Sequence, residues 1–346
     1  MRRSYSLIVP LLVVLSLVLA ACSPAATPTQ QIQPTSAAAE PNTGTITVGG
    51  VSLAEIDPST VSGNIASAGS STVYPLSESV VALFESEGFA GQVTVESIGT
   101  GAGFERFCKG ESDIANASRA IKSSEVDTCK AAGIEPIEFR VGTDAMAVVV
   151  NPKNTFLTDV TNTELAMIFS DQATNWSDVN PAWPAQPIKR YAPGTDSGTY
   201  DYFIEVIMTP ANDDDPKKAM EAFQNASSLQ QSEDDNVLVQ GIEGDEYAIG
   251  FFGFAYYQEE GSKLKALSID GVSPTAETAE NGEYALARPL FIYSSARIMA
   301  DKPQVAQFIT FYLGRVNEVV DEVGYFPASD EALGSAAQAL LDATAP

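Results

Sequence analysis

The chain has 346 residues and is strongly acidic, with 45 aspartates and glutamates against 19 lysines and arginines and a net charge of −26. Such a surface repels nucleic acid and anionic lipid, so we expect no nucleic-acid partner. The chain contains no histidine and only three cysteines, which excludes a Ser-His-Asp or Cys-His catalytic centre and disfavours a metal site. We expect no metal or other cofactor.

The first residues have the pattern of an exported protein. Two arginines precede an apolar run over 7–19, and two alanines stand directly before Cys22. A short apolar core behind basic residues is typical of a secretory signal and is too short for a membrane span. Small residues before a cysteine resemble a bacterial lipoprotein signal, which implies that residues 1–21 are removed and that Cys22 is lipidated. An ordinary cleaved signal followed by an incidental cysteine is the alternative.

The next segment, residues 22–58, is rich in serine, threonine, proline, alanine and glutamine and contains no aromatic residue. Such a composition cannot bury a core, so it predicts a flexible tether between an anchor and a folded domain. A doubly acylated cysteine would hold the chain on the outer side of the cytoplasmic membrane, in a periplasm or at a cell surface. The remaining residues, 59–346, are long enough for two lobes with separate cores.

Strand patterns and helix patterns alternate along the rest of the chain. A capping box at Thr161 to Glu164 opens one of the helices. This alternation predicts an α/β fold with ligands at the carboxyl ends of the strands. In chain order, the clearest elements are a strand at 93–98, a buried strand at 146–150, a helix at 165–169, strands at 248–252 and 289–293, and an amphipathic helix at 305–320.

Four short segments place glycines and hydroxyl residues before predicted helices: 68–75, 99–104, 116–119 and 194–199. The first amides of a helix have no partner within it, and the helix dipole places partial positive charge there. Glycines let the backbone approach an anion, and serine and threonine hydroxyls add donors. Arg119 supplies one full positive charge. The pattern therefore predicts an oxyanion site even in an acidic protein.

Each segment alone also has a purely structural interpretation as a helix cap. The run at 99–103 invites a dinucleotide-binding interpretation, but Phe104 stands where that fingerprint needs its third glycine. Asp196 begins an Asp-Ser-Gly-Thr signature like that of aspartic proteases, whose chemistry needs a second carboxylate sharing one proton. No second such signature occurs, which disfavours a hydrolase.

The ordered set of segments resembles the PstS-type phosphate-binding proteins of bacterial phosphate ABC transporters. The motifs are Gly-Ser-Ser-Thr-Val-Tyr-Pro-Leu from Gly69, Gly-Thr-Gly-Ala-Gly-Phe from Gly99, Asp-Ile-Ala-Asn-Ala-Ser-Arg from Asp113 and Pro-Gly-Thr-Asp-Ser-Gly-Thr from Pro193. The likeness runs from about residue 66 to about residue 325. It implies a monomeric, non-enzymatic solute-binding protein that captures inorganic phosphate and delivers it to the permease of an ABC importer.

The resemblance implies a two-lobed periplasmic-binding-protein fold of type II, with two crossings between the lobes and the ligand cleft between them. Lobe I would comprise 59–143 plus 285–346, and lobe II 144–284. With Cys22 lipidated, Cys108 and Cys129 remain as an even pair in an oxidising compartment, where a disulfide is expected. They also resemble a cysteine pair found in a branch of the family. Two buried free thiols are the alternative.

By the family pattern, eleven residues would bind phosphate: Ser71, Thr72, Val73, Thr100, Gly101, Ser118, Arg119, Asp144, Ser197, Gly198 and Thr199. The sequence departs from the pattern at two positions. Some family members carry an aspartate where Arg119 stands and an arginine where Pro193 stands, so the charges are rearranged and the acid must come from elsewhere.

The acid determines selectivity, because phosphate at neutral pH carries a proton that a carboxylate can accept and sulfate carries none. We favour Asp144, near the expected crossing, ahead of Asp196 and Asp113. Alternatively, Asp144 forms an ion pair with Arg119 and only orients it. Three other functions stay open: a binding protein for another oxyanion, a hydrolase using Asp196, and an adhesion or sensory module.

Overall fold

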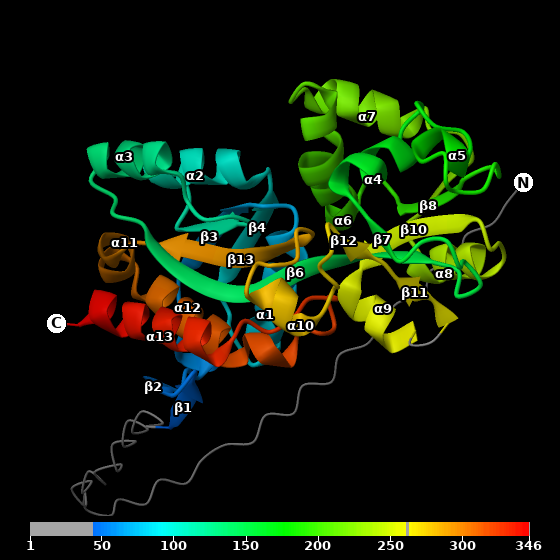
Figure 1. Ribbon diagram of the computed structural model, residues 1–346. Coiled ribbons are helices and arrows are strands. Elements are labelled where there is room, and N and C mark those ends of the chain that lie inside the picture. Colours follow the sequence, from blue (N-terminus) through cyan, green and yellow to red (C-terminus); the bar gives the residue numbers. More distant parts are fainter. Residues whose placement is uncertain (1–43, 261–262, 346) are drawn as a thin grey trace, which may run out of the picture. The chain divides into compact units, whose positions relative to one another are not determined.

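The computed structural model describes residues 44–260 and 263–345 (Figure 1). All of these residues belong to one compact unit, Asn42–Pro346, which we call the body. The predicted signal segment and Cys22 lie outside the described residues. None of the helices in the described ranges has the length and apolar character needed to cross a membrane.

A β-hairpin opens the body. Strands β1 (Thr45–Val48) and β2 (Val51–Ala54) pair antiparallel around a two-glycine turn, and they contact helices α12 (Pro303–Arg315) and α13 (Asp330–Thr344). A Cβ on Gly49 would lie 2.1 Å from the backbone nitrogen of Gly334, so this turn needs glycine. The flexible tether predicted through residue 58 is therefore wrong for 45–54, because alternating apolar residues give the hairpin a face that packs on the body.

Nine strands form one mixed sheet in the order β4-β3-β5-β13-β6-β10-β8-β9, with β11 also pairing with β6. Its two ends are parallel, and its centre around β13 and β6 is antiparallel. The strands are β3 (Asn64–Gly69), β4 (Gln92–Ser97), β5 (Ile114–Ala117), β6 (Ile137–Val150), β8 (Lys189–Pro193), β9 (Leu229–Ser232), β10 (Ala248–Gly253), β11 (Lys265–Ala266) and β13 (Ala287–Ser294). A small parallel pair joins β7 (Asp159–Val160) and β12 (Ser268–Ile269).

Hydrophobic residues collect in separate cores at the two ends of this sheet. One cluster draws on residues 48–141 and 290–340, and includes Phe84 and Phe107. Two further clusters draw on residues 145–286, and the larger one includes Phe169, Phe203 and Phe251. β6 passes from the first core to the others beside β13 (Figure 1). The predicted α/β fold with two lobes is confirmed.

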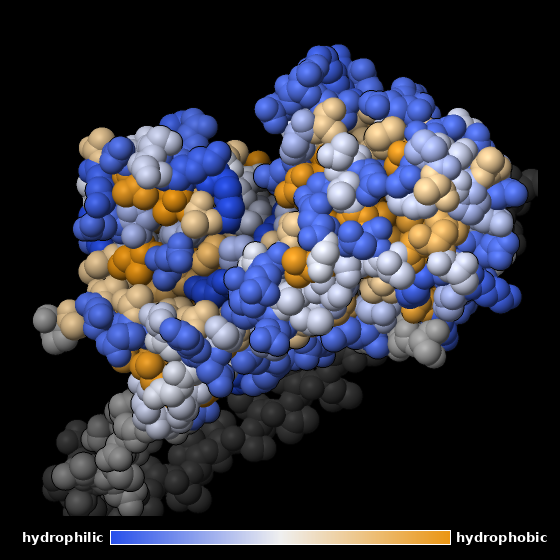
Figure 2. All heavy atoms as spheres, in the orientation of Figure 1, coloured by the Kyte–Doolittle hydropathy of each residue, from blue (hydrophilic) through white to orange (hydrophobic). Residues whose placement is uncertain are grey.

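Helices cover both ends of the sheet. They are α1 (Val73–Ser86), α2 (Thr100–Lys109), α3 (Ser123–Ala131), α4 (Asn162–Ile168), α5 (Trp176–Val179), α6 (Gly198–Phe203), α7 (Pro216–Gln224), α8 (Asp235–Glu243), α9 (Phe254–Glu260), α10 (Ala276–Glu280) and α11 (Ala296–Asp301), besides α12 and α13. Short 3₁₀ turns occupy η1 (Pro58–Thr60), η3 (Pro210–Asn212) and η5 (Val316–Glu318), and α6 continues as a π-helix, η2 (Ile204–Met208). The helix predicted at 305–320 is thus shorter, since it ends at Arg315. The outer surface over α7 is mostly hydrophilic (Figure 2).

Candidate anion-binding site

A cavity of about 330 Å³ lies where segments of both lobes meet. In Figure 2 the surface is hollowed between the part over α2 and the part over α7. Six of the predicted residues line the cavity: Ser71, Thr72, Thr100, Gly101, Ser118 and Arg119. Six further lining residues were not predicted: Ser70, Gly99, Lys122, Asp201, Glu205 and Arg288.

The loop before α1 is held in place by Ser70. The hydroxyl of Ser70 accepts hydrogen bonds from the amides of Thr72 (3.2 Å) and Val73 (3.3 Å). The amide of Ser70 donates to the carbonyl of Asn116 at 2.9 Å. Val73, which was predicted to contact the ligand, is fully buried in the core and does not line this cavity. Ser71 and Thr72 present hydroxyls instead.

The start of α2 forms a second wall. Gly99 has φ +85°, a left-handed conformation that favours glycine. The amides of Thr100, Gly101 and Ala102 have no partner within the helix, as at any helix start. A Cβ on Gly101 would meet no atom within 4 Å. This wall can therefore present free donors to an anion at close range.

Arg119 lies beside this wall, but it forms an ion pair with Glu125 in α3, which offsets much of its positive charge. Its two terminal nitrogens donate to the Glu125 carboxylate at 2.9 and 2.8 Å, and Nη1 also donates to the carbonyl of Ala120 at 3.1 Å. The hydrogen bond to Glu125 raises the pKa of Arg119. Within the described residues, Nε–H and one Nη2–H remain without an acceptor, so a side-on face of the guanidinium is left for a ligand. Lys122 adds a second positive charge to the same wall.

The sequence interpretation missed Arg288, at the start of β13. Its side chain is 8% exposed, and it faces Asp144 directly in the pairing of β13 with β6. Nε donates to Asp144 Oδ2 at 3.0 Å, and Nη2 donates to Thr72 Oγ1 and to the carbonyl of Gly198 (3.1 Å). The guanidinium also stacks on the ring of Tyr202, 3.8 Å from its centroid. Arg288 therefore joins groups of both lobes at the base of the cavity.

One end of Arg288 stays open. Among the described residues, Nη1 makes no hydrogen bond, and it forms a long ion pair with the carboxylate of Glu205, 3.9 Å away. Its two N–H groups are thus the two of the five Arg288 donors that have no acceptor among the described residues. A buried arginine with two free donors is a strong and geometrically specific partner for an oxyanion.

The three acids favoured from the sequence are not at the cavity. Asp144 pairs with Arg288, so an ion pair between Asp144 and Arg119 is wrong. Asp144 is fully buried, and burial raises the pKa of its carboxyl while Arg288 opposes this. Asp113 is tied to Lys302 at 2.7 Å, and Asp196 is exposed. None of the three lines the cavity.

Two other carboxylates, Asp201 and Glu205, do line it. They are four residues apart, across the junction of α6 with the π-helix. Asp201 accepts a hydrogen bond from the hydroxyl of Ser71 at 3.3 Å. Burial raises the pKa of Asp201, and the Ser71 hydroxyl and Arg288 oppose this. The sequence signal that could have identified them is their spacing of four residues, one helical turn, shortly after the Ser-Gly-Thr motif.

The predicted residues Ser197, Gly198 and Thr199 lie beside the cavity without lining it. The hydroxyl of Ser197 accepts from the amide of Thr199 at 3.2 Å and so caps α6. A Cβ on Gly198 would lie 3.3 Å from Cα of Thr72. The motif is therefore packed against the loop before α1, where the bond from Arg288 to the Gly198 carbonyl holds it. Within the described ranges, no three Cys, Asp or Glu side chains are grouped so that they could hold a metal ion.

Comparison with known proteins agrees with this architecture. The family description "PBP superfamily domain" matches residues 54–316. The chain is 46% identical over 280 residues to Protein SphX of Synechococcus elongatus, covering 78% of this chain and 79% of that protein. It is 35% identical over 268 residues to the phosphate-binding protein PstS of Staphylococcus saprophyticus, covering 76% and 80%. It superposes with a TM-score of 0.74 on the crystal structure of a possible phosphate-binding protein from Planctomyces limnophilus, at 38% identity, covering 82% of this chain and all of the other.

The fold and the cavity between its lobes define a solute-binding protein of the periplasmic-binding-protein type, as predicted. The motifs and the relatives narrow this class further. The chain belongs to the family of PstS-type phosphate-binding proteins.

Proposed function

We propose that this protein captures inorganic phosphate in the cavity and delivers it to an ABC importer. The observation that carries the proposal is the open end of Arg288, a buried cation whose Nη1 has no hydrogen-bond partner among the described residues. The hydroxyls of Ser71 and Thr72 and the free amides of α2 surround the same cavity. The relatives named as phosphate-binding proteins support phosphate as the anion.

The proposed ligands are the six predicted residues that line the cavity, together with Arg288. Asp144 is reassigned as the group that orients Arg288. Ser197, Gly198 and Thr199 reach the anion only if lobe II shifts relative to lobe I, which is the hinge closure expected of such a protein. Val73 contributes by packing and not by contact.

Selectivity for phosphate over sulfate is proposed to come from Asp201 and Glu205, in place of the three acids favoured earlier. A carboxylate can accept the proton that phosphate retains at neutral pH, whereas sulfate offers only negative charge. Burial raises the pKa of Asp201, while the Ser71 hydroxyl and Arg288 favour the ionised carboxylate that would accept this proton.

The remaining assignments are also proposals. Removal of residues 1–21, lipidation of Cys22, a monomeric state, docking on a permease and the absence of enzymatic activity come from the sequence pattern and the family. A division into 59–143 plus 285–346 and 144–284 is supported by the residue ranges of the hydrophobic clusters.

Calorimetric titration of the body, stripped of bound anion, tests the function. Every described element, every core cluster and the disulfide lie within this compact unit. We expect one-to-one phosphate binding at physiological ionic strength, no response to sulfate, and strong weakening by Arg119→Ala. Arg106→Ala, a change of a half-exposed arginine paired with Glu96 outside the cavity, is the matched control. If neither anion binds, phosphate is the wrong ligand and other oxyanions are to be titrated.

A further inference from the structure

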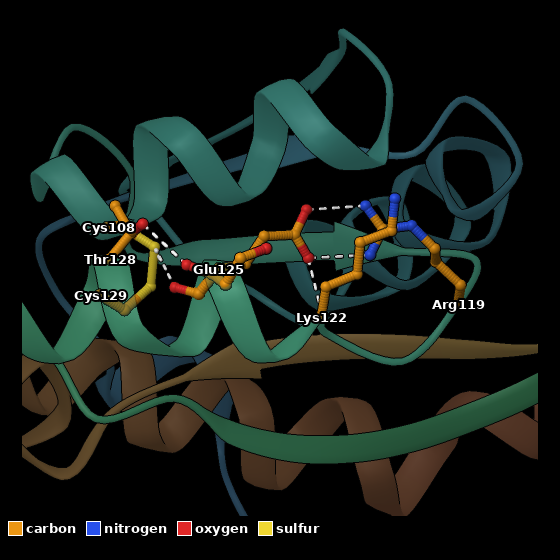
Figure 3. Close-up of a disulfide and its surroundings, with 7 residues drawn as sticks. Cys108, Arg119, Lys122, Glu125, Thr128 and Cys129 are labelled. Carbon is orange, nitrogen blue, oxygen red and sulfur yellow. Dashed lines mark hydrogen bonds and ion pairs between the residues drawn. A yellow bond between two sulfur atoms is a disulfide. The ribbon is translucent and has the colours of Figure 1, made fainter.

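The segment 118–122, which joins β5 to α3, carries three residues of the cavity wall: Ser118, Arg119 and Lys122. Glu125 holds this segment from within α3. Its carboxylate accepts two bonds from Arg119 and one from the amide of Lys122, at 2.8 Å (Figure 3). A further bond runs from the amide of Ile121 to the Tyr293 hydroxyl at 3.1 Å. The placement of both cations therefore depends on where α3 lies.

α3 has little hydrophobic packing to fix it. Of its nine described residues, Cys129 alone is buried. Cys129 follows Glu125 by one helical turn and is joined by a disulfide to Cys108 in α2. Cys108 Sγ also lies 3.6 Å from the carbonyl oxygen of Glu125 (Figure 3). The disulfide is thus a covalent link between α3 and α2 at the one residue of α3 that is buried.

The other end of the disulfide belongs to α2, whose first residues line the cavity next to Ser118. Cys108 is near the end of α2, the helix that begins with the free amides of Thr100 and Gly101. At a rise of about 1.5 Å per residue, each cysteine is roughly 10 Å along its helix from the cavity. The disulfide therefore connects α2 with α3, the helix that follows the lining segment 118–122, while staying out of reach of the ligand.

We propose that the Cys108–Cys129 disulfide, acting through α3 and Glu125, positions Arg119 and Lys122 for anion binding, so that affinity depends on the redox state of this pair. The inference rests on the proposed function, since it presumes that the cavity binds an anion. A dithiol reductant breaks the S–S bond, gives two thiols and closes its own disulfide. Once α3 is freed, the side chains of Arg119 and Lys122 are ordered only when the anion binds. The entropy lost in ordering them lowers the affinity by about three- to tenfold.

The test compares phosphate affinity of the oxidised and the dithiothreitol-reduced body by calorimetry, well below the unfolding temperature. The body lacks Cys22, so Cys108 and Cys129 are its only cysteines. We expect weaker binding after reduction, the same weaker binding in Cys108→Ser/Cys129→Ser with or without reductant, and little effect of reduction in Arg119→Ala. Leu340→Ala, a core change in α13, is the control that lowers stability without moving α3, and it should leave affinity unchanged.

Glu125→Gln provides a test that needs no reduction, so it remains available if the reduced protein unfolds. Removing a negative charge near the anion would by itself strengthen binding. The positioning role predicts the opposite, because glutamine has one acceptor oxygen in place of the two carboxylate oxygens that hold Arg119. We therefore expect weaker phosphate binding in oxidised Glu125→Gln. Tighter binding in this variant, or equal affinity of the folded oxidised and reduced proteins, overturns the inference and leaves the proposed function intact. If the oxidised wild-type body binds no phosphate, the proposed function falls and the inference falls with it.

Discussion

Replacing Arg288 by methionine tests the central feature of the site. Two charge-assisted hydrogen bonds from Nη1 to the anion are lost, each worth about 1.5–3 kcal/mol. Together they amount to about 3–6 kcal/mol, which corresponds to a loss of affinity of roughly 10²- to 10⁴-fold. The substitution also leaves Asp144 buried without its partner, which costs about 3–5 kcal/mol of stability. A binding defect in the single variant could therefore come from unfolding.

The double variant Arg288→Met/Asp144→Asn separates the two effects. It removes the unpaired buried charge, so we expect denaturant unfolding to show a recovery of much of the lost stability, while calorimetry still shows little phosphate binding. Arg297→Met, at an exposed position of α11 outside the cavity, should leave both quantities unchanged. A folded double variant that binds phosphate within threefold of the wild type would refute the assignment of Arg288 as the principal cation.

Three further outcomes are expected. Asp201→Asn should let sulfate bind measurably in calorimetry. Because burial raises the pKa of Asp201, its ionisation opposes folding. Chemical unfolding should therefore show that the variant is more stable than the wild type at neutral pH and that this difference disappears as the solution is acidified. Gly99→Ala should cost about 1–2 kcal/mol of stability, because φ there is +85°, and should weaken phosphate binding measurably. The intact mass of the body should rise by two hydrogens on reduction, with alkylation then labelling both Cys108 and Cys129, and labelling without reductant would contradict the disulfide.

The fold could be predicted largely because its signals are local. Apolar runs such as 248–252 and 289–293 lie within strands β10 and β13, and the capping box at Thr161 does open α4. The end of α6 could not be predicted, because a π-helix depends on packing against neighbouring elements rather than on the periodicity of its own residues.

The residues of the candidate site that stand in short local motifs could be predicted from the sequence. The residues that meet only through pairing between distant strands were missed. Ser71, Thr100 and Arg119 stand in short motifs before helices, and the structure brings them to one cavity. Arg288 and Asp144 are 144 residues apart and meet only through the register of β13 with β6. Without that register, Asp144 could be placed near the crossing, but its partner could not be named.

The continuity of β6 has a consequence for how the protein unfolds. Its first part pairs with β13 and its last five residues pair with β10, so one strand supplies hydrogen bonds to the sheet on both sides of the cavity. Unfolding of the strands paired with either part of β6 would leave backbone N–H and C=O groups of β6 without partners. We therefore expect the two lobes to unfold as one cooperative unit, with a single calorimetric transition in place of two.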